Sequence, residues 1–162
     1  MNKGLIAVLN DGIKMAGGNY IARMDSDDIS SVKRLKVQLK YLLKNDLDFV
    51  SCSSRIINSK GSRIGSVTNK GVYHESISWA SVLAQPFVHG SVLGKADCFK
   101  KNLYSHDAIH SEDYELWCRL IRLNYIFGRT PQFLYSLRKH TASVSSLFEQ
   151  TQINSHLKTA FE

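Results

Sequence analysis

The chain has few of the features that mark disulfide-rich, zinc-binding or membrane-spanning proteins. Only three of its 162 residues are cysteine, and their odd number and wide spacing predict reduced thiols rather than disulfide bonds or a zinc site. The first sixteen residues interrupt their apolar positions with Asn2, Asn10, Asp11 and Lys14, which favours neither a signal peptide nor a spanning helix. We therefore expect a cytoplasmic protein.

Proline is also scarce, with two residues, and acidic residues are outnumbered by basic ones. The 43% hydrophobic and 22% charged residues are typical of a globular protein, and the length fits one α/β or α+β domain over residues 1–162. The net charge of +7 attracts phosphate groups, whether of nucleic acid, an anionic membrane or a nucleotide-linked substrate. Because the aromatic residues are not interleaved with the basic ones, nucleic acid is the least favoured of these partners.

Hydrophobic periodicity predicts alternating helices and strands. Helices are expected at residues 4–16, 30–44, 73–85 and 111–124, and from 145 onward. Strands are expected at residues 19–24, 48–57, 63–67, 88–98, 125–127 and 132–137, with Pro131 as a break between the last two. In the helix at 30–44, the leucines are expected to face the core and the basic residues to form a solvated outer face.

Three carboxylates follow the strand predicted at 19–24: Asp25, Asp27 and Asp28. Open α/β sheets place ligands where a strand gives way to a loop, and carboxylate oxygens suit Mg²⁺ or Mn²⁺. Such an ion can neutralise the charge on a departing diphosphate. An Asx turn, with Asp28 or Ser30 capping the next helix, is the alternative that needs no ligand.

A second acid pair, Glu112 and Asp113, opens the helix predicted at 111–124. The helix dipole and a cap by Ser111 explain such a pair without any chemistry. Alternatively, one carboxylate held at a rigid helix start acts as general base on a hydroxyl nucleophile. His89 and His140 have no partner at metal-ligand spacing, and each alone is typical of a structural histidine.

Five segments in order resemble the central and C-terminal blocks of inverting, family-two nucleotide-sugar glycosyltransferases. They are GLIAVLNDGIKMAGGNYIARMDSDDIS, RLKVQLKYL, FVHGSVLGK, SEDYELWCRL and LYSLRKHTASVSS. The resemblance implies a GT-A fold, which is a Rossmann-like mixed sheet flanked by helices. It also implies that Asp25 and Asp27 bind the divalent metal and the nucleotide-sugar donor, with Asp28 adjacent.

The same resemblance assigns roles to the other polar residues. Asp113, paired with Glu112, is implied to deprotonate the acceptor hydroxyl for in-line attack that inverts the anomeric carbon. The remaining implied binding residues are His89 and Ser91 on the acceptor side, and Arg138 and His140 near the diphosphate. By family analogy the acceptor is a polysaccharide or a lipid-linked sugar, with peripheral contact to an anionic membrane.

Members of this family open with a strand and turn that hold the nucleotide base, and this sequence has no such start. We therefore expect a partial GT-A fold without its N-terminal strands, with an open sheet edge that favours self-association or a partner chain. The alternative function is a catalytically inactive remnant that acts, if at all, as an interaction protein.

Overall fold

The computed structural model describes residues 4–68, 73–81 and 85–140. The helices are α1 (Leu5–Met15), α2 (Arg34–Lys44), α3 (His74–Ser81), α4 (Ala96–Lys101) and α5 (Glu112–Arg122), with a 3-10 turn η1 (His89–Ser91). The strands are β1 (Tyr20–Ala22), β2 (Ile29–Ser30), β3 (Phe49–Ile57), β4 (Arg63–Val67), β5 (Leu93–Lys95) and β6 (Phe127–Arg138). The helix predicted from residue 145 lies outside this part of the chain.

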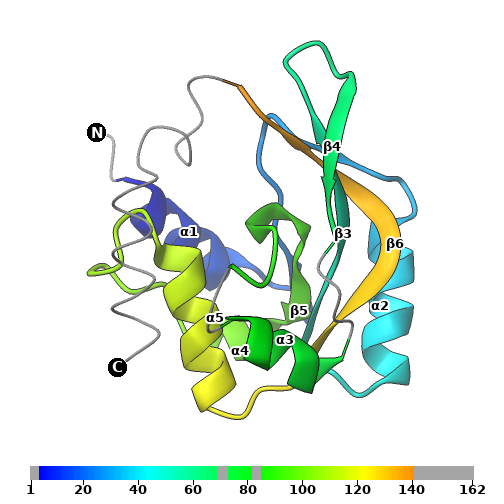
Figure 1. Ribbon diagram of the computed structural model, residues 1–162. Helices are drawn as coiled ribbons and strands as arrows, with labels where there is room; N and C mark the ends of the chain where they lie inside the picture. Colours follow the sequence, from blue (N-terminus) through cyan, green and yellow to red (C-terminus); the bar gives the residue numbers. More distant parts are fainter. Residues whose placement is uncertain (1–3, 69–72, 82–84, 141–162) are drawn as a thin grey trace.

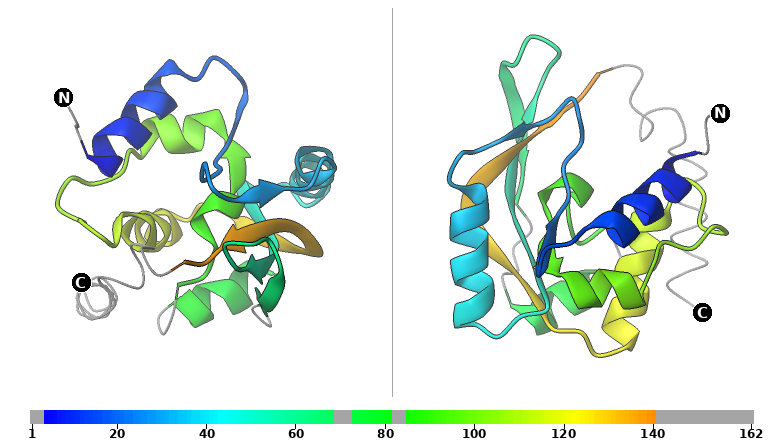
Figure 2. Two further views of the ribbon diagram at one scale, coloured as in Figure 1. Left: turned by 90° about the horizontal axis from the view of Figure 1, so that it is seen from above. Right: turned by 180° about the vertical axis from the view of Figure 1, so that it is seen from behind.

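A mixed sheet forms the middle of the molecule, with strand order β1-β5-β3-β6-β2 and β4 paired to β3 as the predicted hairpin. Strands β3 and β6 are parallel, whereas β5 runs antiparallel to both β1 and β3. Helices α1, α4 and α5 lie on one side of the sheet and α2 on the other (Figures 1 and 2). The first six residues of β3 are buried, as expected of a central strand covered on both faces.

The main core lies between the sheet and the α1–α4–α5 side. At its centre the ring of Phe49 stacks on Trp117 of α5 and Phe127 of β6, with centroids 5.3 and 5.0 Å away. A smaller cluster on the other face joins Leu42 of α2 to Val50 and other sheet residues. Because α5 contributes its most buried residues to the main core, the start of this helix is held rigidly against the sheet.

Strand β6 is continuous, so the predicted break at Pro131 is wrong. Cys52 of β3 pairs with Thr130 and Ser53 with Phe133, so residues 131–132 form a bulge that the parallel ladder skips. Proline lacks an N–H donor and is tolerated at such a bulge. The strand predicted at 19–24 is shorter and less buried than expected, and residues 88–98 form η1, β5 and the start of α4.

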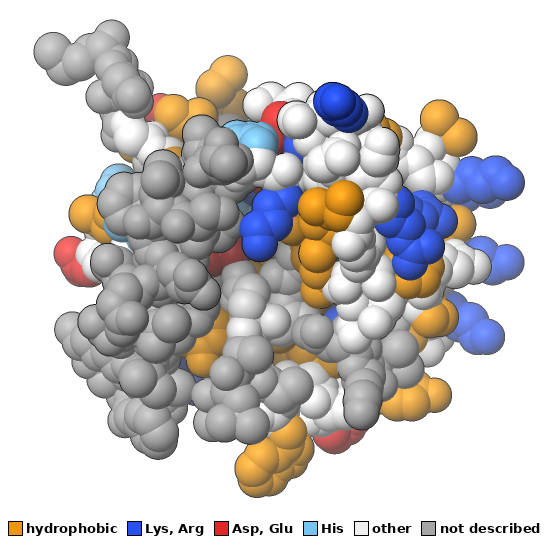
Figure 3. All heavy atoms as spheres, turned by 45° about the horizontal axis from the view of Figure 1, so that its top comes forward, with side chains coloured by type: hydrophobic (Ala, Val, Ile, Leu, Met, Phe, Trp, Pro, Cys, Tyr) orange, Lys and Arg blue, Asp and Glu red, His pale blue; other side chains and the backbone are white. Residues whose placement is uncertain are grey.

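Helix α2 begins at Arg34 and presents a different face to the protein than predicted. Its buried residues are Arg34, Gln38 and Leu42, whereas Leu35 and Leu43 are 51% and 61% exposed. The two polar side chains are tolerated inside because backbone carbonyls accept their N–H groups. The outward lysines were predicted correctly, and basic side chains line the side of the molecule where α2 lies (Figure 3).

The sheet has an open edge at β1. This strand pairs with β5 on one side and with no other strand in the described residues, as the sequence predicted. Beside that edge α1 exposes Leu5, Val8 and Met15, which are 50%, 57% and 84% accessible. None of the helices in the described part of the chain is long and apolar enough to cross a bilayer.

Candidate active site

The acidic loop follows β1 and is fixed from beneath by β6. The Asp25 carboxylate is paired with Arg23, and the Asp25 backbone N–H donates to the Tyr135 hydroxyl over 3.2 Å. The side chains of Asp25 and Asp27 are 37% and 46% exposed, so both carboxylates are open to solvent. The structure therefore places two accessible carboxylates at the end of β1.

Asp28 differs from its neighbours because its carboxylate is buried. One oxygen accepts a hydrogen bond from the Tyr135 hydroxyl and the other from the Arg138 backbone N–H, both at 2.6 Å. Burial raises the pKa of Asp28, and these two bonds oppose the increase. Because both carboxylate oxygens bond to β6, Asp28 anchors the loop. Neither Asp28 nor Ser30 caps α2, so the capping alternative is wrong.

Two predicted residues at the end of β6 lie beside Asp27. The Arg138 guanidinium donates from Nε to the Asp27 carbonyl over 2.7 Å, and from a terminal nitrogen to the Asn58 and Ser59 carbonyls. His140 Nε2 lies 3.3 Å from an Asp27 carboxylate oxygen. The structure thus brings Asp27 together with Arg138 and His140, although Asp27 is more than a hundred residues from both in the sequence.

Asp113 lies in the first turn of α5 and is held by two hydrogen bonds. Its carboxylate accepts one from the Gln85 amide and one, at 2.8 Å, from the Tyr114 backbone N–H. Burial, with a smaller contribution from neighbouring Glu112, raises the pKa of Asp113 to about 6. The predicted cap is wrong, because the buried Ser111 makes no side-chain capping bond.

His89 lies between Asp113 and a buried tyrosine. Its Nε2 lies 2.6 Å from the Tyr104 hydroxyl, and its Nδ1 lies 4.0 Å from an Asp113 carboxylate oxygen. Burial lowers the pKa of His89 well below its ordinary value, so the ring is neutral near pH 7. Ser91, by contrast, is fully buried and its hydroxyl donates to the Val88 carbonyl, so this side chain does not line a cleft.

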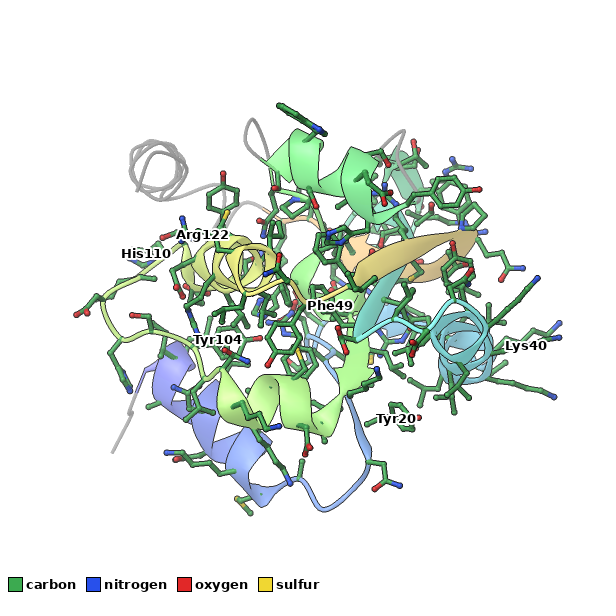
Figure 4. The ribbon with its side chains drawn as sticks, turned by 90° about the horizontal axis from the view of Figure 1, so that it is seen from below. Tyr20, Lys40, Phe49, Tyr104, His110 and Arg122 are labelled. Carbon is green, nitrogen blue, oxygen red and sulfur yellow. The ribbon has the colours of Figure 1, made fainter. Side chains whose placement is uncertain are left out.

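Asp25 of the acidic loop and the acid pair of α5 both affect the pKa of the Tyr104 hydroxyl. Burial chiefly raises the pKa of Tyr104, and the charges of Asp113, Glu112 and Asp25 raise it further while Arg23 lowers it. In Figure 4, Tyr104 lies between α5 and the layer of α1 and α4. A cavity of about 420 Å³ adjoins this point and is lined by α1, residues 20–24, Val92, Phe99, Tyr104 and Trp117.

A family model confirms the resemblance. The model of glycosyl transferase family 2 matches residues 1–103, which is more than half of the chain. The chain belongs to this family. Its acidic loop lies within the matched segment, whereas α5 and the end of β6 lie beyond it.

Curated proteins similar to the chain are also glycosyltransferases. The chain is 35% identical over 137 residues to the O-antigen biosynthesis glycosyltransferase WbnJ of Escherichia coli, covering 83% of this chain and 53% of the relative. It is 31% identical over 145 residues to WfgD of the same species, a UDP-Glc:α-D-GlcNAc-diphosphoundecaprenol β-1,3-glucosyltransferase, covering 90% and 54%. The chain therefore spans about half the length of these two relatives.

Solved structures confirm the GT-A fold. A mannosyltransferase from Pyrobaculum calidifontis, in complex with GDP-Man and Mn²⁺, superposes with a TM-score of 0.67 at 16% identity, covering 98% of this chain and 44% of its own. S. aureus TarS superposes with a TM-score of 0.65 at 14% identity, covering 99% and 51%. At these identities the likeness establishes the shared fold.

The acidic loop is compatible with a hard divalent cation. Within residues 4–68, 73–81 and 85–140 no three His, Cys, Asp or Glu side chains form a ready-made metal cage. Mg²⁺ keeps several waters and binds through one or two carboxylates together with substrate phosphates, so a closed cage is not required. The accessible carboxylates of Asp25 and Asp27 fit that requirement, and the buried Asp28 does not.

Sequence reasoning missed four residues that organise the site: Arg34, Gln85, Tyr104 and Tyr135. Arg34 donates to the Gly90 carbonyl over 2.6 Å and to the Arg23 carbonyl over 3.0 Å, which ties η1 to the acidic loop. Its guanidinium also lies 5.1 Å from the centroid of the Tyr135 ring. Each of these side chains acts through contacts distant in the sequence, so spacing gave no signal for them.

Proposed function

We propose that the chain takes part in transferring a sugar from a nucleoside-diphosphate donor to a hydroxyl group of a polysaccharide or lipid-linked acceptor in the cytoplasm, with inversion. One observation carries this proposal: Asp25, in the loop that holds two accessible carboxylates, and Asp113, a buried carboxylate of raised pKa, both act on the Tyr104 hydroxyl through their charges. The Asp25 and Asp27 carboxylates suit a cation and a diphosphate, and the Asp113 carboxylate suits a general base.

Asp113 is the proposed general base. With a pKa of about 6 it is ionised at pH 7, yet it is basic enough to accept a proton as an acceptor hydroxyl attacks. The proton passes to the Asp113 carboxylate while the acceptor oxygen bonds to the anomeric carbon and the bond from that carbon to the diphosphate oxygen breaks. The nucleoside diphosphate leaves from the opposite face, so the configuration inverts.

Asp25 and Asp27 are the proposed ligands of Mg²⁺ or Mn²⁺, which would stabilise the negative charge of the leaving diphosphate. Arg138 and His140 lie beside Asp27 and are proposed to contact the diphosphate, with Asp28 fixing the loop from beneath. Two solved structures of the same fold, the mannosyltransferase in complex with GDP-Man and Mn²⁺ and TarS in complex with UDP-GlcNAc, support a nucleotide-sugar donor and a divalent cation.

Helix α2 is the proposed contact with an anionic membrane. Lys33, Lys36, Lys40 and Lys44 are exposed, and Leu43, one helical turn from Lys40, is exposed beside them. Figure 4 shows Lys40 directed away from the protein. Such a basic and apolar strip attracts anionic lipid, and the acceptor named for WfgD is lipid-linked.

Vesicle flotation tests this contact. We expect binding to vesicles that contain phosphatidylglycerol and none to pure phosphatidylcholine. Each Lys→Gln change on α2 should weaken binding roughly fivefold at low salt. Equal binding to both kinds of vesicle would contradict the electrostatic assignment.

Calorimetric titration tests the donor site. UDP and GDP are titrated into the chain with and without Mn²⁺, and into the Asp25→Ala and Asp27→Ala variants. The exposed Asp97→Ala change on α4 serves as the matched control, because it removes a carboxylate away from the loop. Cation-dependent binding that the loop variants lose and the control retains is the expected result. A folded chain that binds neither nucleotide under any condition would contradict the proposal.

The open β1 edge favours one second candidate, a non-catalytic interaction protein. The edge of β1 that pairs with no strand in the described residues, the exposed apolar residues of α1 and the adjoining cavity form a surface that an added strand from another chain or a second copy can cover. Light scattering after size exclusion distinguishes monomer from assembly. Assembly without cation-dependent nucleotide binding favours this candidate, whereas a stable monomer contradicts it.

A further inference from the structure

His89 is fixed from both of its neighbouring elements. The turn η1 that carries it is held by α2, since Arg34 donates to the Gly90 carbonyl and Gln38 to the Ser91 carbonyl, at 2.6 and 2.8 Å. The imidazole ring also packs edge-on against Trp117 of α5, with centroids 6.0 Å apart. The orientation of the ring is therefore set by buried contacts that do not involve substrate.

Tyr104 is fixed just as firmly from another direction. The buried Asn10 side chain of α1 accepts from the Tyr104 backbone N–H and donates to its carbonyl, both at 2.9 Å. The tyrosine hydroxyl lies 2.6 Å from His89 Nε2. Burial keeps the pKa of Tyr104 far above neutral, so the hydroxyl keeps its proton and can donate it to a neutral imidazole.

The direction of the hydrogen bond between His89 and Tyr104 determines the tautomer of the histidine. If Nε2 accepts from the Tyr104 hydroxyl, the single proton of the neutral ring resides on Nδ1. Nδ1 is the nitrogen that lies 4.0 Å from the Asp113 carboxylate, on the same oxygen that accepts from Gln85. Catalytic hydrogen bonds are often long before substrate binds and shorten in the reactive complex.

We propose that His89 is a positioning residue for the Asp113 carboxylate, held by the Tyr104 hydroxyl in the tautomer that carries its proton on Nδ1. This inference rests on the proposed role of Asp113 as general base. Together with Gln85, the Nδ1–H group holds one carboxylate oxygen in place. The other oxygen, which accepts from the Tyr114 backbone N–H, is the one that takes the proton from the acceptor hydroxyl.

Several neighbouring groups affect the pKa of Asp113 in the folded chain. Burial and then the charge of Glu112 raise the pKa of Asp113, whereas the Tyr114 backbone N–H and Arg23 lower it. Arg23 also contributes to lowering the pKa of His89. An Nδ1–H dipole directed at Asp113 stabilises its ionised form, so removing that dipole should raise the pKa of the carboxyl group.

Nitrogen NMR of histidine-labelled protein tests the tautomer without nucleotide or cation. At about pH 7.5 the wild-type chain is expected to show a protonated Nδ1 and an unprotonated Nε2 for His89. Tyr104→Phe removes only a hydroxyl and should shift the ring toward the other tautomer, whereas Tyr41→Phe on α2 should leave it unchanged. A wild-type His89 protonated on Nε2 overturns the proposal.

Carbon NMR titration of the Asp113 carboxyl group tests the positioning. His89→Phe keeps a ring of similar shape but no N–H group, and should raise the pKa of Asp113 by roughly 0.5. His89→Gln restores an N–H donor and should return the pKa close to the wild-type value. Equal pKa values in the wild-type, Phe and Gln proteins overturn the proposal, as do equal increases in both variants.

The proposed role of His89 and the proposed sugar transfer can be refuted independently of each other. Both NMR measurements use the unliganded chain, so they report on His89 even if calorimetry finds no donor binding. If sugar transfer is detected, the acidic limb of the kcat/KM profile should move with the pKa of Asp113 in His89→Phe and stay in place in His89→Gln. A purely structural His89 would lower activity in both variants without moving that limb.

Discussion

Replacing Asp113 by asparagine should abolish sugar transfer and stabilise the fold above pH 6. Burial raises the pKa of Asp113 from its ordinary value to about 6 in the folded chain. Between about pH 4 and pH 6 the folded state therefore holds a proton that the unfolded state has released. The wild-type protein loses stability as the pH rises through that window, because the ionised carboxylate is buried without a full counter-charge.

The magnitude follows from the change in pKa. A difference of about 2 between the folded and unfolded values corresponds to about 2–3 kcal/mol of unfolding free energy lost by pH 8. The side chain is only 20% exposed, so solvent screens little of this effect. Asparagine resembles the protonated carboxyl group: it keeps the shape and one acceptor oxygen, for either Gln85 or the Tyr114 backbone N–H, and it carries no charge at any pH.

Urea unfolding followed by circular dichroism measures the difference. At pH 4 the variant and the wild-type chain should be similarly stable, and the advantage of Asp113→Asn should grow up to pH 6 and then remain constant. Asp107→Asn, on an exposed loop, is the matched control for loss of one carboxylate. A variant that is less stable at pH 8, or a difference that does not change with pH, would refute a buried base of raised pKa.

Three further predictions concern buried residues beside the site and in the core. Tyr135→Phe removes one of the two 2.6 Å donors to the buried Asp28 carboxylate and should lower the unfolding free energy by about 1–3 kcal/mol in urea titrations. Gly90→Ala should lower it by at least about 3 kcal/mol, because a Cβ would lie 2.0 Å from the Tyr135 hydroxyl, which Asp28 holds in place. The buried Cys52 and Cys98 thiols, whose pKa values burial raises to about 11 and about 12, should not react with a thiol reagent at pH 8 until the chain is unfolded.

The sequence predicted the features that depend on local pattern. Helix α1, the β3–β4 hairpin and helix α5 appear close to their predicted positions, because periodicity and turn residues lie within one short segment. The acidic loop at a strand end and the acid pair at a helix start could also be recognised locally. The order of the five motifs was enough to identify the family that the family model confirms.

Only the tertiary structure decided how those pieces meet. Helix α2 has leucines on more than one face, so its pattern did not reveal that Arg34 and Gln38 point inward, where carbonyls of η1 receive them. Likewise, Tyr135 reaches Asp28 across 107 residues of sequence, and Tyr104 reaches His89 from a separate loop. The spacing of residue types along the sequence carries no information about such pairs, because a buried polar group is tolerated only where the fold brings its hydrogen-bond partner to it.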